Sequence, residues 1–265
     1  MTTADPSNPV PAQSMPLPDV PPPLPTSLLV EPRVVPAGAA MQWLTTGWEM
    51  FKAAPGPWIG IVLVYVIITA VVGAMPLLGI LNVVLSPILS AGVVAACESQ
   101  RRGTPPSLEH LFAGFKQATG SLALVGLLYM GGLLVVTLTV GAGGMAAMLP
   151  FIIAASAGGS DFSMSPGMIG IIVLCVLLAF LLFMPLALAM IWAPPLVFVH
   201  NVGPFDALKR SLFACLRNWM ALLVFFVLAM VLLVPAMIPL GLGLLVYGPV
   251  MVIALWAGYR EVFVA

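Results

Sequence analysis

Charged residues are confined to short segments between three long stretches that carry almost none, and this arrangement constrains the fold more than any other feature. The stretches 53–97 and 218–259 hold no charged residue, and the stretch 118–208 holds only Asp161 and Asp206. Each stretch is long enough to cross a bilayer twice, because one spanning helix needs about 20 apolar residues. We therefore expect three helical hairpins in a membrane.

The composition supports a membrane-embedded chain. Hydrophobic residues make up 62 % of the sequence and charged residues 7 %, whereas a soluble domain carries about 25 % charged residues. The formal net charge is zero, so the chain lacks the basic surface that nucleic-acid binding requires. We predict an all-α, polytopic membrane protein whose main partner is the lipid bilayer, with no nucleic acid.

Proline and glycine residues divide the stretches into six transmembrane helices. The expected spans lie near residues 58–75, 80–98, 120–141, 168–192, 219–236 and 240–258. The apolar piece at 145–157 is too short for a seventh span, and we leave open whether it is re-entrant or an outer-surface helix. With six spans, all nine Lys and Arg residues lie on one side, so the positive-inside rule predicts that both termini are cytoplasmic.

The N-terminal residues 1–38 are rich in proline, which removes backbone donors and fixes φ. We predict a disordered cytoplasmic tail ahead of a membrane domain at 39–265. The tail is a candidate docking segment for a protein partner, and a simple spacer is the alternative.

Each predicted hairpin follows a short amphipathic stretch on the cytoplasmic side. These stretches cover 41–52, a segment from Ser107 to Lys116, and a segment that begins at Pro204. We expect each to lie in the membrane interface with its apolar face toward the lipid. The basic residues that we expect to contact anionic lipids are Lys52, Arg101, Arg102, Lys116, Lys209, Arg210 and Arg217.

Two of the hairpin units also match in sequence. The pattern Phe51-Lys52-x-Ala54-x-Gly56 recurs as Phe115-Lys116-x-Ala118-x-Gly120. We predict an internal repeat of an interfacial helix plus a hairpin, with all copies in the same orientation. Shared apolar composition without common descent is the alternative.

Motifs for catalysis, nucleotide binding or metal binding are missing from the sequence. His110 and His200 are far apart in the chain and lack further candidate ligands nearby, so we expect no metal site and no cofactor. The predicted spans hold almost no ionisable residue, which argues against a proton relay or a central site for an ionic substrate. We therefore expect a protein that is not an enzyme.

Asn82, Ser86 and Ser90 recur at four-residue spacing in the second predicted span and therefore share one helix face. Such a polar stripe either lines a cavity for a solute or packs against a neighbouring helix. Packing is the more common role, and the sequence leaves both alternatives open.

One cluster of motifs resembles a known family. The motifs are Pro194-Pro195-Leu-Val-Phe, Asp206-Ala-Leu-Lys-Arg-Ser211 and Arg217-Asn-Trp219. They resemble the YciC-like proteins and the related membrane domain of glycerophosphoryl diester phosphodiesterases. The resemblance implies a six-span fold in a bacterial inner membrane, and it carries no catalytic residue onto this chain.

Two classes of function fit these features. The first is a non-enzymatic scaffold, assembly or membrane-organising protein that acts through the proline-rich tail or the basic interfacial helices. The alternative is a carrier or channel for a neutral or lipidic solute, lined by Asn82, Ser86 and Ser90.

Overall fold

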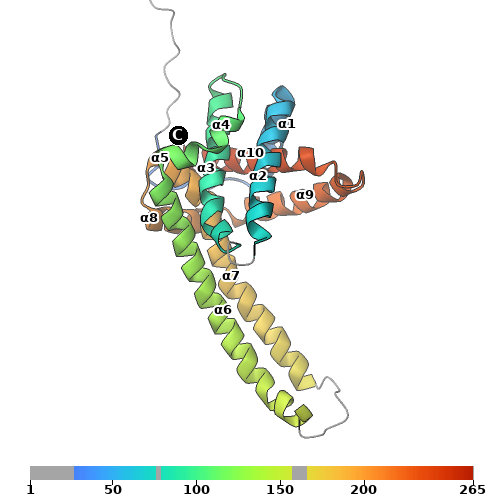
Figure 1. Cartoon of the computed structure of the whole chain (residues 1–265). Coiled ribbons are helices and arrows are strands. Elements are labelled where there is room, and N and C mark those ends of the chain that lie inside the picture. Colours follow the sequence, from blue (N-terminus) through green and yellow to red (C-terminus); the bar gives the residue numbers. More distant parts are fainter. Residues whose placement is uncertain (1–26, 76–78, 157–165, 265) are drawn as a thin grey trace, which may run out of the picture.

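A computed structural model describes residues 27–75, 79–156 and 166–264 (Figure 1). These residues are helical apart from short connections and one isolated bridge between Leu28 and Val264. The predicted all-α fold is confirmed. The helices are α1 (Ala39–Ala53), α2 (Pro55–Gly73), α3 (Leu81–Arg101), α4 (Leu108–Leu111), α5 (Ala113–Gln117), α6 (Thr119–Ser156), α7 (Pro166–His200), α8 (Pro204–Arg217), α9 (Trp219–Met237) and α10 (Leu244–Phe263).

A break of one residue joins each short helical segment to the long helix that follows it. The breaks lie at Ala54, Ala118 and Asn218, where φ is −151°, −141° and −110°. Each of these carbonyls accepts a hydrogen bond from the amide four residues further on, at 2.9 to 3.3 Å. Ala54 and Ala118, which match in the sequence comparison, thus occupy equivalent junctions. Common descent of the units stays a prediction.

Helix α6 is longer than the sequence suggested. It runs unbroken from Thr119 to Ser156 over 38 residues, so the prediction of a separate short helix at 145–157 is wrong for the described residues. The reason is that Gly141 and Gly143 leave the helix intact, because an internal glycine costs only about 1 kcal/mol relative to alanine. Asp161, one of the two charged residues of the stretch 118–208, lies outside the described residues.

Helix α7 continues past residue 192, where we expected it to end, to His200. The hydroxyl of Ser211 on α8 accepts a hydrogen bond from the Trp192 amide at 3.0 Å and donates one to the Leu188 carbonyl at 2.9 Å. The hydroxyl thereby bridges the Trp192 amide and the Leu188 carbonyl, which are a helical donor and acceptor pair of α7. This bridge lies just before Pro194 and Pro195. Burial raises the pKa of the neighbouring Cys215 thiol to about 12, so the protonated sulfur donates to the same carbonyl at 3.4 Å.

The amphipathic helices α1 and α8 differ in what covers their apolar faces. Trp43 and Phe51 of α1 are buried, and a Cβ at Gly47 would lie 2.5 Å from the Val250 carbonyl oxygen. The expectation that α1 turns its apolar face toward lipid is therefore wrong, because α10 covers that face. Helix α8 instead buries small residues against α7 and leaves Phe205 and Leu216 exposed.

Five helices in the described part of the chain are long and apolar enough to cross a membrane, whereas we expected six. The five are α2, α3, residues Thr119–Met145 of α6, residues Ile169–His200 of α7, and α9. Helix α10 differs because it carries Arg260 and Glu261 and buries much of its surface inside the bundle. In Figure 1, α9 and α10 run across the direction of α2 and α3.

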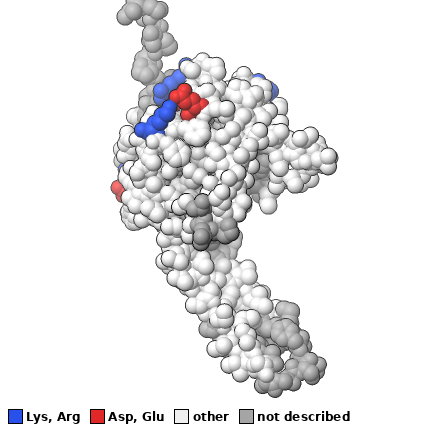
Figure 2. Space-filling view, viewed as in Figure 1, with Lys and Arg blue, Asp and Glu red and all other residues white. Residues whose placement is uncertain are grey.

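Helices α6 and α7 extend together away from the remaining helices and form what we call the arm (residues 133–156 and 166–186; Figure 1). The arm exposes large apolar side chains, among them Leu134, Val135, Leu174 and Leu181. The other helices, together with residues 119–132 of α6 and 187–200 of α7, form what we call the body. Figure 2 shows charged side chains on the body and none along the visible face of the arm.

Residues 27–38, which we assigned to the tail, lie along the end of α10. The amides of Leu29 and Arg33 donate to the carbonyls of Phe263 and Val262 at 2.9 and 2.8 Å. Asn218 accepts from the Val35 amide at 2.8 Å and donates to the Arg33 carbonyl at 3.0 Å. Residues 1–26 of the predicted tail lie outside the described residues.

Candidate functional site

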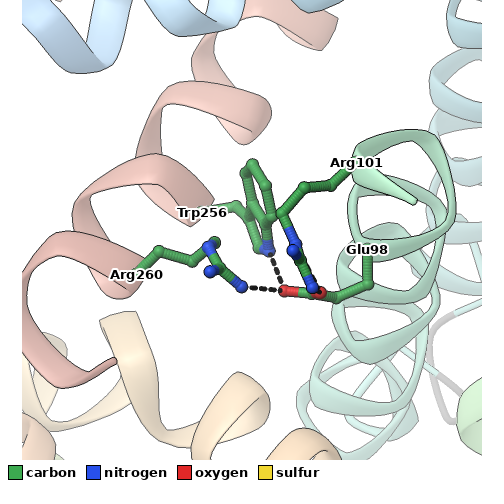
Figure 3. Close-up of polar contacts among 4 residues, drawn as sticks. All are labelled: Glu98, Arg101, Trp256 and Arg260. Carbon is green, nitrogen blue, oxygen red and sulfur yellow. Dashed lines mark hydrogen bonds and ion pairs between the residues drawn. The ribbon is translucent and has the colours of Figure 1, made fainter. Parts of the chain in front are cut away.

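Glu98 is the one charged side chain that is buried in the described part of the chain. It lies near the end of α3, and its two carboxylate oxygens have different partners (Figure 3). Oε1 accepts from Trp256 Nε1 at 3.2 Å and from Arg260 at 3.0 Å, both on α10. Oε2 accepts from Nε and Nη2 of Arg101 at 3.1 and 3.0 Å. One carboxylate thus joins α3 to α10 and faces two guanidinium groups.

This cluster was not predicted from the sequence, where residue 98 is only the last residue of the second expected span. The available signal was weak: one acid at the end of a charge-free stretch, with Arg101 one helical turn further on. The arginine on α10 is 162 residues away in the chain. A single sequence does not reveal that these two helix ends meet.

An apolar cavity of about 320 Å³ lies beside the cluster, between α2, α3, α7 and α10. Valine, leucine and isoleucine side chains form most of its wall, together with Tyr65, Ser90, Trp192 and Trp256. Val66 of α2 also lines it and is 51 % exposed, so the cavity reaches the outer surface of the helices. Such a space suits a hydrocarbon chain rather than an ion.

A second, more open pocket of about 630 Å³ lies on the other side of Trp256, between α1, α3 and α10. Arg101 and Arg260 line it, and so do the carboxylates Glu49 and Glu261. Trp256 belongs to both walls. The apolar cavity and this polar pocket are therefore neighbours that share one lining residue.

Gln100 fixes the rim of the polar pocket. Its side-chain oxygen accepts from Trp58 Nε1 at 2.7 Å, and its amide nitrogen donates to the Met50 carbonyl at 2.8 Å. Trp58 lies in the first turn of α2 and Met50 on α1. The junction between α1 and α2 is thereby held against the end of α3.

The predicted polar stripe is only partly a cavity wall. Ser90 lines the apolar cavity. Asn82 instead donates from Nδ2 to the Thr69 carbonyl at 2.8 Å, which bonds α3 to α2. Ser86 is half-buried and does not line the cavity. The structure therefore does not bring the three residues together in one cavity wall.

The basic residues predicted to contact anionic lipids have diverse surroundings. Lys52, Lys116 and Arg217 form exposed ion pairs with Glu49, Glu109 and Glu31 at 3.0, 2.7 and 3.3 Å. Lys116 lowers the pKa of the Glu109 carboxyl. Arg102, Lys209 and Arg210 are exposed. Arg101 is the one member of this set that belongs to the Glu98 cluster.

The described residues contain no group of three or more His, Cys, Asp or Glu side chains that could hold a metal ion. His110 has a structural contact, because its Nδ1 accepts the Ser107 amide at 3.0 Å at the start of α4. His200 lies beside the ring of Tyr259, at 6.1 Å between centroids.

Comparison with known proteins gives one distant relative. The chain is 29 % identical over 192 residues to a protein of Burkholderia thailandensis that is described as a probable inner membrane protein, and the match covers 69 % of each chain. Protein-family models give no match, and solved structures give none. The chain is thus a distant homologue of a probable inner membrane protein of unknown function, and its helices imply contact with the lipid bilayer.

Proposed function

We propose that the protein is a non-enzymatic, multi-pass protein of the bacterial inner membrane that binds a lipidic ligand between its helices. The observation that carries the proposal is the apolar cavity between α2, α3, α7 and α10, which reaches the lipid-facing surface at Val66. A membrane protein that only packs its helices has no need of such a space. The proposal concerns binding of the lipid and does not require its transport across the membrane.

A bulky side chain at the mouth of the cavity tests this proposal. Val66 and Val71 lie on the same helix and are 51 % and 52 % exposed, but only Val66 lines the cavity. We expect Val66→Trp to lower the amount of co-purifying lipid, measured by native mass spectrometry, by about tenfold. Val71→Trp is the matched control and should leave it unchanged. Equal lipid content in both variants would contradict the proposal.

A scaffold role is the second candidate, and the arm favours it. Its exposed apolar side chains extend beyond the body, and helix partners in membranes meet through such surfaces. We expect Leu174→Ala with Leu181→Ala to reduce co-purification of any partner from digitonin extracts. Leu223→Ala on α9, a leucine that is also more than half exposed but lies outside the arm, serves as the control. Deletion of residues 1–26 tests docking through the tail in the same assay.

We also propose the finer topology, in which α10 is the sixth crossing and both termini face the cytoplasm. The charge distribution of the sequence supports it. So does the position of residues 27–38 beside the end of α10, because these two segments then lie on one side. Fusion of a reporter that is fluorescent only in the cytoplasm to each terminus tests this, and a dark fusion at either end would reject it.

The similarity to the YciC-like proteins remains part of this proposal. It is supported by the contacts of Ser211, which bonds α8 to α7, and of Asn218, which bonds to residues 33–35. Ser211 and Asn218 therefore hold the fold together and do not line the proposed ligand cavity, whereas Pro195 of the first motif does line it.

A further inference from the structure

We infer that the polar pocket binds the headgroup of a zwitterionic phospholipid with a primary ammonium group, and that one acyl chain of this lipid fills the apolar cavity. This inference rests on the proposed lipid-binding function and specifies its ligand. The phosphate would lie against Arg101 and Arg260, and the ammonium against Glu49 and Glu261.

The two arginines supply a phosphate site. Both arginine side chains are largely buried, at 17 % and 20 % exposure, and they share the buried carboxylate of Glu98. Glu98 engages Nε and Nη2 of Arg101 and Nη1 of Arg260, so each guanidinium keeps donors that Glu98 does not use. Guanidinium groups bind phosphate oxygens through short, charge-assisted hydrogen bonds.

Two carboxylates on the same pocket supply the opposite charge. Glu49 on α1 pairs with Lys52 and is 61 % exposed, and Glu261 on α10 accepts from the Trp43 indole. Counted with Glu98 and Lys52, which lie beside the pocket but do not line it, the charges are neutral overall, and the lining charges come from three helices: Glu49 from α1, Arg101 from α3, and Arg260 with Glu261 from α10. A neutral pocket with separated charges complements a dipolar headgroup better than a net anion.

The spacing of the two pockets fits one lipid molecule. Val94 lines the apolar cavity and Arg101 the polar pocket, and seven helical residues correspond to roughly 10 Å along α3. The headgroup region occupies about 5–8 Å on each side of the hydrocarbon core. A phosphate at Arg101 thus places the upper acyl carbons at the depth of the cavity, and Trp256 lines both pockets between these two positions on the lipid.

A panel of defined lipids tests the inference on the full chain. Delipidated protein in micelles would receive phosphatidylethanolamine, phosphatidylglycerol or diacylglycerol with identical acyl chains, and retention would be measured by native mass spectrometry. We expect phosphatidylethanolamine to bind about tenfold more tightly than the other two, the effect of one charge-assisted hydrogen bond. Inorganic phosphate at millimolar concentration should not displace it, because free phosphate lacks the acyl chain.

A change of specificity gives a sharper test than a loss of binding. The double variant Glu49→Gln with Glu261→Gln makes the pocket net positive while an amide oxygen remains to accept from Trp43. It should reverse the preference, so that phosphatidylglycerol binds more tightly than phosphatidylethanolamine. Glu109→Gln is the matched control, because Glu109 also forms an exposed ion pair with a lysine but does not line the pocket.

The outcomes separate this inference from the function on which it rests. Equal retention of diacylglycerol, or tighter binding of phosphatidylglycerol by the unchanged protein, would overturn the headgroup assignment and leave lipid binding in the cavity intact. An unaltered preference in the double variant would also overturn it. If no lipid is retained and Val66→Trp has no effect, both proposals fail.

Discussion

The body and the arm are both rich in apolar residues, but they differ in the side-chain hydrogen bonds that connect one helix to another. In the body, polar side chains reach from one helix to another: Glu98 to α10, Gln100 to α1 and α2, and Ser211 to α7. In the arm, the hydroxyls of Thr139 and Ser156 bond to carbonyls of their own helix. The body is therefore tied together between helices, whereas the described polar groups of the arm make no such tie.

This difference has a physical basis in the solvent. Lipid tails are as apolar as leucine, so burial of apolar surface does not drive helices together inside a bilayer. Close packing of small residues and hydrogen bonds between helices remain as the stabilising terms. The body has both, and the arm exposes its apolar surface. We therefore expect substitutions of polar and small residues to lower the stability of the body. In the arm, we expect an introduced charge to reduce membrane insertion.

The largest effect is expected from Glu98→Gln in the body. It leaves Arg101 and Arg260 without their shared carboxylate, and breaking a buried ion pair typically costs 3–5 kcal/mol. The free energy of unfolding, measured by titration with sodium dodecyl sulfate in mixed micelles, should fall by about that amount. Phe180→Ala in the arm, where the ring is 62 % exposed, is the control with little expected change. A Glu98 variant as stable as the control would show that the cluster does not hold α3 to α10.

A charge placed on the arm should be the next most costly change. Leu177 is 59 % exposed on α7, and a lysine at the centre of a spanning helix costs about 2.5–3.5 kcal/mol on insertion scales. We expect Leu177→Lys to reduce membrane insertion, measured with a glycosylation reporter in microsomes. Phe205→Lys on α8, a site that is also exposed (70 %) but lies outside the predicted spans, should insert normally. Normal insertion of both variants would mean that the arm does not lie in the hydrocarbon core.

The contrast also explains which features the sequence could predict. Charge-free stretches indicated the long helices, since span length and hydropathy are local properties. The repeated sequence pattern around Ala54 and Ala118 corresponds to two equivalent breaks between helices, because such a break is also a local feature of the chain. The Glu98–Arg260 contact, the burial of α1 against α10, and the cavity depend on how distant helices cross. Of the predicted stripe, Ser90 alone reached the cavity, because helix periodicity gives a shared face but not the neighbour that covers it.

Alanine substitutions at two glycines should show the same difference between the body and the start of the arm, with a smaller effect on stability. A Cβ at Gly92 of α3 would lie 2.0 Å from the Leu111 carbonyl oxygen, whereas one at Gly131 of α6, just before the arm, would meet nothing within 4 Å. Gly92→Ala should destabilise the protein by about 1–3 kcal/mol, the usual cost of overpacking. Gly131→Ala should be neutral or stabilising by up to about 1 kcal/mol, because alanine favours the helix. The same detergent titration measures both, and equal effects would contradict the assignment of close packing to α3 and α4.

The smallest expected difference is between two hydroxyls. Ser211→Ala removes the group that bonds to both the Trp192 amide and the Leu188 carbonyl, and we expect a loss of about 1 kcal/mol, the net value of a typical hydrogen bond. Thr139→Val in the arm removes only a bond of 2.8 Å to the Val135 carbonyl of the same helix, which has its helical partner in any case, so we expect no measurable change. If the two variants were equally stable, the Trp192 amide would have found another acceptor. The Ser211 hydroxyl would then not be required for α7 to continue through Pro194 and Pro195, the second of which lines the ligand cavity.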